Sequence, residues 1–91
     1  MIEELYIQDC LNKFTSEYRH RNITIIRYCI EKNRVEVELV RGLTKVMASL
    51  AQTQFLYALY TTYGIRPSFQ ELIKVDGESY KLKAGLFKLE V

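Results

Sequence analysis

The chain is poor in the residue types that most often build metal and catalytic sites. Its 91 residues contain one histidine, His20, and two cysteines, Cys10 and Cys29, which are widely separated and form no CxxC pair. A zinc site needs several clustered ligands, and a cysteine nucleophile needs a histidine beside it and a third group that orients the ring. The sequence therefore predicts no metal, no cofactor and no enzyme activity. The two thiols are expected to be free and buried.

One alternative keeps a chemical role for a thiol. If Cys29 or Cys10 lay beside His20, the chain would be a small enzyme, or the accessory subunit of one, with a reactive cysteine. A rapid reaction with an alkylating reagent at neutral pH would reveal such a group, because the thiolate is the reactive form.

Proline is also scarce, and tryptophan is absent. With one proline and 48% hydrophobic residues, the chain has the composition of a folded domain rather than of a disordered segment. Its length suits one domain, since a chain of this size buries only about 60–65% of its unfolded surface and cannot support two cores. Seven tyrosines and four phenylalanines supply the aromatic groups, and tyrosine suits surfaces that are partly apolar and partly wet.

Charge is absent from the residues Val46 to Tyr63, in a chain in which 26% of residues are charged. Several alanines and leucines favour helix there, and apolar positions surround the helical axis almost completely, so this helix must be covered on most sides. A membrane span is the alternative, since about 20 apolar residues cross a bilayer. Polar side chains such as Gln52 and Gln54 argue against it, because each would need a partner in hydrocarbon. We therefore predict a central buried helix and no membrane.

The net charge of +2 is close to balance, and it does not by itself indicate a polyanionic partner. The N-terminal residues begin acidic, with Glu3 and Glu4, and lack a basic segment followed by an apolar run. No secretory signal is readable there, and the sequence predicts a cytoplasmic protein.

Periodicity predicts a helix and then a hairpin in the first half of the chain. A helix at about Glu3–Tyr18 would gather one apolar face. That face consists of Ile7, Cys10, Leu11, Phe14 and Tyr18. Alternating and β-branched residues then predict strands at Ile23–Ile30 and Val35–Val40, joined by a short polar turn in which Asn33 tolerates positive φ.

The second half is expected to hold the long helix and three strands. The helix should begin at Leu43 or Thr44 and end at Gly64, which suits the left-handed position after a helix. Ser68–Glu71 has the spacing of a capping box and favours one short helical turn after Pro67, the alternative being that strand already begins at Phe69. The predicted strands are Leu72–Val75, Glu78–Lys83 and Leu86–Val91.

Two local signals position those strands. Asp76-Gly77 supplies the two positive-φ residues of a type I′ turn, and Gly85 indicates a bulge or a second tight turn. The lysines of this region should project mostly from the open face of the sheet, opposite Glu36 and Glu38 if the strands are neighbours. These lysines are Lys74, Lys81, Lys83 and Lys88. The predicted fold class is α+β: a single domain with the order α-β-β-α-β-β-β, whose mostly antiparallel sheet packs against a long central helix.

The long helix also supplies the first candidate site. Its least apolar sector contains Lys45, Ser49, Gln52, Thr53, Leu56, Tyr60 and Tyr63. Its apolar sector contains Leu43, Val46, Met47, Leu50 and Ala58, with Gln54 nearby and expected to be buried. If the first sector faced solvent, a symmetric partner would cover it, and the interface candidates are Gln52, Leu56, Tyr60 and Tyr63. The alternative is that this side packs within the same chain. The leading hypothesis is a non-enzymatic interaction module that forms a homodimer through this stripe or through a strand edge.

The second candidate site is the basic segment 19–34. Its basic residues are Arg19, His20, Arg21, Arg27, Lys32 and Arg34, with Tyr18 and Tyr28 interleaved. Such a segment can contact phosphates through arginines and stack bases on rings, which predicts DNA or RNA binding. The alternative is a solvated loop followed by the outer face of a hairpin.

Overall fold

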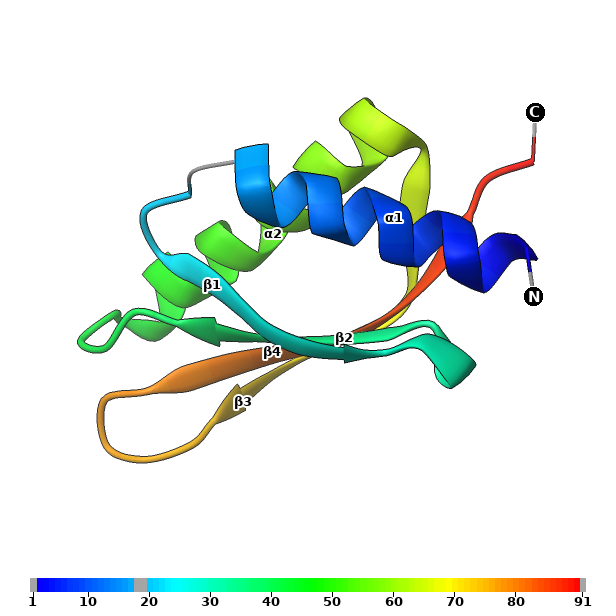
Figure 1. The fold of residues 1–91 in the computed structure, drawn as a ribbon. Coiled ribbons are helices and arrows are strands. Elements are labelled where there is room, and N and C mark those ends of the chain that lie inside the picture. Colours follow the sequence, from blue (N-terminus) through cyan, green and yellow to red (C-terminus); the bar gives the residue numbers. More distant parts are fainter. Residues whose placement is uncertain (1, 18–19, 91) are drawn as a thin grey trace.

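The computed structural model describes residues 2–17 and 20–90 of the chain. Within these residues two α-helices and four strands form one compact domain (Figure 1). In chain order the elements are α1 (Ile2–Glu17), β1 (Ile23–Cys29), the 3-10 helix η1 (Ile30–Lys32), β2 (Arg34–Leu39), α2 (Lys45–Tyr63), β3 (Ile65–Lys74) and β4 (Tyr80–Lys88). The predicted α+β class is confirmed, with the order α-β-β-α-β-β in place of the expected seven elements.

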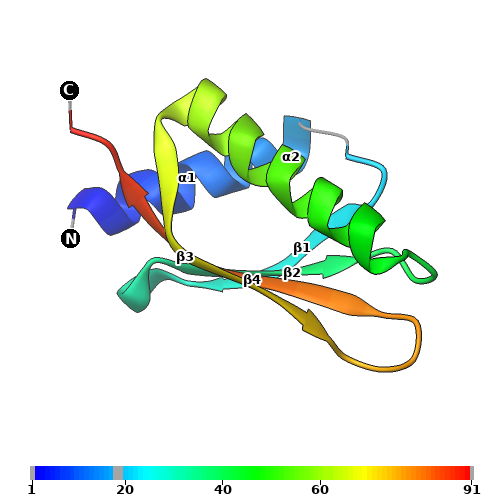
Figure 2. The same cartoon turned by 180° about the vertical axis from the view of Figure 1, so that it is seen from behind.

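Both helices lie on the same face of the sheet, as two opposite views show (Figures 1 and 2). The strand order is β1-β2-β4-β3, and every neighbouring pair is antiparallel. Alternation along β2 explains the one-sided cover, because Val35, Val37 and Leu39 are buried toward the helices while Glu36 and Glu38 point to the other face. That other face of the sheet is open.

The first hairpin has the predicted position and turn chemistry. Asn33 lies in the turn and has a positive φ of 50°, the only such value among the described non-glycine residues. An asparagine tolerates this left-handed conformation better than most residues. The pairing of β1 with β2 shifts between Ile25 and Arg27, which places a bulge in the edge strand β1.

The second hairpin places β4 beside β2. The register sets two opposite-charge pairs across these strands: Lys83 with Glu36, and Lys81 with Glu38. These pairs were predicted for the case in which the strands are neighbours. The prediction is wrong for Lys74 and Lys88, which alternation turns to the helix side; the Lys88 Nζ lies 4.3 Å from the ring centroid of Tyr6 on α1.

Two C-terminal strands replace the three that were predicted. β3 already begins at Ile65, so Ser68 lies in a strand, and the expected helical turn is wrong. Ser68 is the bulged residue, because the register shifts between Pro67 and Phe69. β4 continues through Gly85 without a break, so the expected last strand is the end of β4. A Cβ at this glycine would lie 2.6 Å from a ring carbon of Phe69, which is why the strand needs glycine here.

The turn between β3 and β4 is not the predicted type I′ turn. Neither Asp76 nor Gly77 has positive φ. The loop is wider and is closed by a 2.8 Å bond from the Val75 N–H to the Ser79 carbonyl. The Asp76 carboxylate accepts the Glu78 N–H at 3.0 Å, and this bond lowers the pKa of the carboxyl. The Asp side chain thus replaces the left-handed backbone that the dipeptide was expected to supply.

α2 begins and ends where the sequence predicts. The Thr44 hydroxyl accepts the Met47 N–H at 3.2 Å, as an N-cap residue does. Gly64 ends the helix in the left-handed conformation, with φ 68° and ψ 31°. In the part of the chain that the structure describes, no helix, α2 included, has the length and apolarity needed to cross a bilayer.

The core lies between the helices and the sheet. The predicted apolar face of α1 is confirmed, with Ile7, Cys10, Leu11 and Phe14 buried, while Tyr18 lies outside the described residues. The Phe14 ring meets Phe55 of α2 edge to face, at 5.3 Å between centroids. The helices are also joined by a hydrogen bond of 2.8 Å from the Tyr6 hydroxyl to the Tyr63 carbonyl.

Candidate functional site

The outer side of α2 exposes apolar side chains and carries no charge. The α2 stripe consists of four residues with 78%, 49%, 56% and 66% of their surface exposed: Val46, Met47, Leu50 and Tyr57. Thr53, Gln54 and Thr61 lie among them on the same side and are uncharged too. A helix side that faces water ordinarily carries charged residues, so this surface differs from an ordinary helix exterior.

The predicted orientation of α2 is therefore wrong. Of the four interface candidates, Gln52 and Leu56 are buried, and Tyr63 is half-buried against the core. Tyr60 is exposed and lies under the guanidinium of Arg66, at 5.4 Å from the ring centroid. The alternative that this side packs within the same chain is the correct one.

The buried side of α2 combines large and small side chains. Phe55 and Leu59 are fully buried in the core. Ala48 and Ala51 on the same side are also buried, and their small side chains let the helix approach the sheet. Because these four residues are spaced at i, i+3, i+7 and i+11, the signal was present in the sequence.

The burial of the two α2 glutamines is the reverse of what the sequence predicted. Gln54, which was expected to be buried, is exposed, and its Oε1 lies 3.1 Å from the His20 Nε2. Gln52 is buried, and its Oε1 has no hydrogen-bond partner among the described residues. A buried carbonyl without a donor reduces the stability of the fold.

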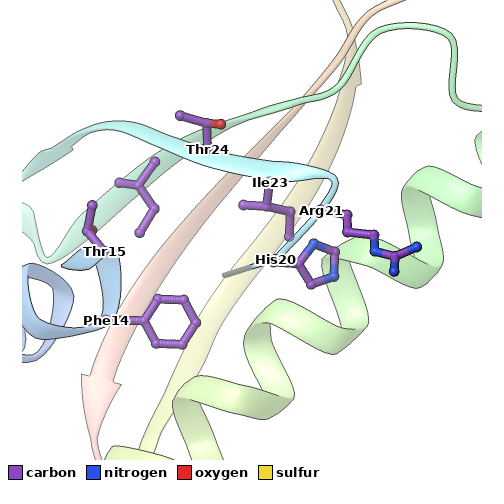
Figure 3. A pocket seen from close by; sticks show the side chains of 7 residues that line it. Phe14, Thr15, His20, Arg21, Ile23 and Thr24 are labelled. Carbon is purple, nitrogen blue, oxygen red and sulfur yellow. The ribbon is translucent and has the colours of Figure 1, made fainter. Parts of the chain in front are cut away.

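His20 and Arg21 line a hollow of about 370 Å³ between the end of α1 and the start of β1 (Figure 3). The His20 Nδ1 accepts the Asn22 N–H at 3.1 Å, so its Nε2 carries the proton and donates to Gln54. The imidazole thus ties the loop before β1 to α2. Arg21 is exposed, and Arg19 lies outside the described residues.

The structure does not gather the basic candidates on one surface. His20 and Arg21 precede β1, whereas Arg27, Lys32 and Arg34 lie toward its other end. Arg27 is held by Glu36, with an Nη2 to Oε2 distance of 2.7 Å. Its hydrogen bond lowers the pKa of the Glu36 carboxyl. The described basic residues of segment 19–34 are therefore divided between the two ends of the first hairpin.

The open face of the sheet brings some of these residues beside new ones. Three rows of outward-facing residues cross the strands in the order β1, β2, β4, β3: Cys29, Arg34, Gly85 and Phe69; Arg27, Glu36, Lys83 and Glu71; Thr24, Glu38, Lys81 and Ile73. A hollow of about 700 Å³ lies over the first two rows. Its existence follows from Gly85, which contributes no side chain to the first row.

Arg34 and Phe69 form the distinctive part of this hollow, which we call the sheet hollow. The Arg34 guanidinium lies 5.9 Å from the centroid of the Phe69 ring, within cation–π range. The Phe69 residue is 44% exposed. Among the described residues, Arg34 has no acidic partner at ion-pair distance, in contrast to Arg27. Phe69 had no place in any site predicted from the sequence.

The thiols do not form the expected pair of buried groups. Cys10 is buried, and burial raises the pKa of its thiol, which disfavours the reactive thiolate. Cys29 is exposed, so the prediction of a buried thiol is wrong there. β1 separates Cys29 from His20 by about 20 Å of extended chain, too far for a nucleophile and its base. The described residues contain no cluster of three or more potential metal ligands.

In comparisons with known proteins, no family model, no curated protein and no solved structure matches the chain at a significant level.

Proposed function

We propose that the chain is a small, non-enzymatic interaction module that forms a two-fold homodimer through the α2 stripe. The observation that carries this proposal is the exposure of Val46, Leu50 and Tyr57 on a helix side without charge. Exposed apolar surface of this kind favours association, because covering it removes apolar area from water.

A second copy fits this surface better than a charged partner does. In a two-fold interface the same patch meets itself, so any charge near the axis would face a like charge. From Val46 to Tyr63 there is no charged side chain that would cause this repulsion. The adjacent cation, Lys45, lies at one end of the helix, and two antiparallel copies would keep these lysines far apart.

The geometry of the pair follows from the position of the stripe. Two α2 helices that cross in antiparallel orientation near Thr53 would place Leu50 of one copy against Tyr57 of the other. A helix of 19 residues is about 28 Å long, so one helix side offers a modest contact area. We expect a dissociation constant of about 1–100 µM, since small interfaces are at the weak end of specific association.

The strand edges are the other surfaces on which copies could pair, and both are interrupted. The edge strand β1 has its bulge near Ile26, and the edge strand β3 has a bulge at Ser68 and a proline at position 67. Bulges and prolines disrupt the regular row of donors and acceptors that a further strand would need. The helix side is therefore the favoured interface.

Sedimentation velocity over about 2–200 µM protein tests the dimer directly. We expect the weight-average mass of the wild type to rise from one chain toward two over this range. Leu50→Lys should raise the dissociation constant at least about a hundredfold, because a buried unpaired charge weakens association. Leu5→Lys is the matched control, since Leu5 on α1 is 61% exposed against 56% for Leu50.

The proposal fails if the wild type stays monomeric at the highest concentration, or if Leu5→Lys prevents dimer formation as strongly as Leu50→Lys does.

We also propose that the chain is cytoplasmic. The exposed free thiol of Cys29 supports it, because such thiols persist in reducing compartments.

A further inference from the structure

We propose that the sheet hollow binds nucleotides, with the base stacked on Phe69 and the phosphate held by Arg34 and Lys83. This site lies on the open face, on the side of the sheet away from α2. It is therefore independent of the proposed dimer contact, and each proposal can fail without the other.

The aromatic group of the site is available for stacking. Phe69 is on the edge strand β3, directly across from Gly85, and its ring rests over the glycine backbone. One side of the ring is supported by the strand, and the Phe69 residue is 44% exposed. A flat ring fixed on an open sheet is the kind of group on which a base stacks, and such a contact tolerates any base because every base has a π face.

One cationic group lies over the ring and the other lies in the next row of the sheet. Arg34 is one strand away from Gly85, and its guanidinium lies 5.9 Å from the Phe69 centroid. Lys83 is exposed in the next row and lines the same hollow. A ligand with a planar ring and an adjacent anion suits these groups, and a nucleotide carries both.

The acidic residues of the hollow lie beside Lys83 and leave Arg34 without an ion-pair partner among the described residues. The Glu36 carboxylate is occupied, because Arg27 binds it at 2.7 Å and the Lys81 Nζ lies 3.9 Å from it. Glu71 lies in the second row, directly across from Lys83 and one row away from Arg34. A carboxylate in that position can accept a hydrogen bond from an exocyclic amine or from a ribose hydroxyl.

Fluorescence anisotropy with labelled single-stranded RNA and DNA of about six nucleotides tests the site in low salt. We expect Phe69→Leu to weaken binding about tenfold, because leucine keeps the apolar contact and loses the stack. Phe69→Tyr should bind as the wild type does. Arg34→Gln should reduce the magnitude of the slope of log affinity against log salt by about 0.7, which is the loss of one phosphate contact.

Two control variants show whether these effects are specific to the sheet hollow. Arg41→Gln removes an exposed arginine at the opposite end of β2 and should leave the salt slope unchanged. Leu50→Lys, on the far layer, should leave the affinity unchanged. Competition with uridine and adenosine monophosphates distinguishes the source of the ligand. If a monophosphate binds as tightly as the labelled strand does per nucleotide, the site is assigned to free nucleotides. If it competes more weakly than that, the site is assigned to single strands.

Several results would overturn the proposal. They are the absence of any anisotropy change and of any mononucleotide binding at low salt, an unchanged affinity in Phe69→Leu, and an equal reduction of the slope in Arg41→Gln. Thermal unfolding of each variant, measured in parallel, shows that a loss of binding does not reflect a loss of fold.

Discussion

The outer side of α2 and the open face of the sheet differ in the charges they carry. The sheet face alternates signs across its strands, so that Arg27, Glu36 and Lys83 succeed one another in a single row. The outer side of α2 has no charge along its length. On the sheet face, Arg27 and Lys81 form ion pairs with Glu36 within the chain, whereas the exposed apolar side chains of α2 are not covered by the described residues.

α1 shows that this difference does not come from helix formation. It lies on the same sheet face as α2, yet its outer side carries the ion pair of Asp9 with Lys13, at 3.2 Å. This is the ordinary amphipathic pattern of a helix with one wet side. This uncharged exterior thus distinguishes α2 from α1, which is why we propose α2 for the contact between copies.

The largest predicted effect comes from comparing Phe55 with Tyr57, two nearby aromatic residues on opposite sides of α2. Phe55→Ala removes a fully buried ring from the core and should lower the free energy of unfolding by about 3–5 kcal/mol. Tyr57→Ala should change it by less than about 0.5 kcal/mol in dilute solution, since the ring is exposed. Urea unfolding of both variants below the dimer concentration range makes the measurement. Equal losses in the two variants would contradict the orientation of α2.

On the sheet face, Gly85→Ala should have the next largest effect. The added Cβ would lie 2.5 Å from the Ser68 Oγ and 2.6 Å from the Phe69 ring, so the ring must move off the strand. We expect a loss of about 1–3 kcal/mol in the free energy of unfolding, as in other overpacked sites. Gly77→Ala is the control, because nothing lies within 4 Å of its added Cβ and its φ is not positive. An equal loss in both variants would show that Phe69 does not cover Gly85.

Gln52→Met tests the buried side of α2, where the Gln52 amide is surrounded by the core. The Gln52 Oε1 is buried without a hydrogen-bond donor among the described residues, so an apolar side chain of similar length should stabilise the fold by about 1–2 kcal/mol. Gln54→Met on the exposed side provides the matched substitution. It removes the bond to His20 and should be neutral or destabilising. A loss of stability in Gln52→Met would show that its carbonyl has a donor in solution.

The smallest effect concerns the charges of the sheet face and depends on pH. The pKa of Glu36 is lowered because Arg27 donates to its carboxylate. A carboxyl with a lowered pKa in the folded state stabilises the fold above its unfolded pKa and loses this contribution as pH falls through the folded pKa. Stability of the wild type should therefore decline more steeply below about pH 4.5 than that of Glu36→Gln. Parallel pH curves from chemical unfolding would refute this role.

Local chemistry predicted much of the fold. Gly64, Thr44 and Asn33 act on their own segments of backbone, so the end of α2, its start and the first turn could be predicted from the residues themselves. Asp76-Gly77 is the exception, because a side-chain hydrogen bond to Glu78 produced a wider loop than the dipeptide favours. The orientation of α2 was missed because apolar residues surround this helix on most sides, so their number does not decide which side is buried.

The candidate sites were harder to predict than the elements. Arg34 and Phe69 are far apart in the sequence and meet only because β4 lies between β2 and β3. The sequence alone does not determine that strand order, so it placed Arg34 in a basic segment with Arg21 instead of beside an aromatic ring. Residues grouped by sequence position were separated by the fold, and residues from different hairpins were joined.

The bulges near Ile26 and at Ser68 also limit how many copies can assemble. Strands added at regular edges would extend the sheet without end and build a fibre. With both edges irregular, growth in that direction is blocked, and an isologous contact is complete once two chains have met. As the protein concentration rises, the chain should therefore form dimers and no larger assemblies.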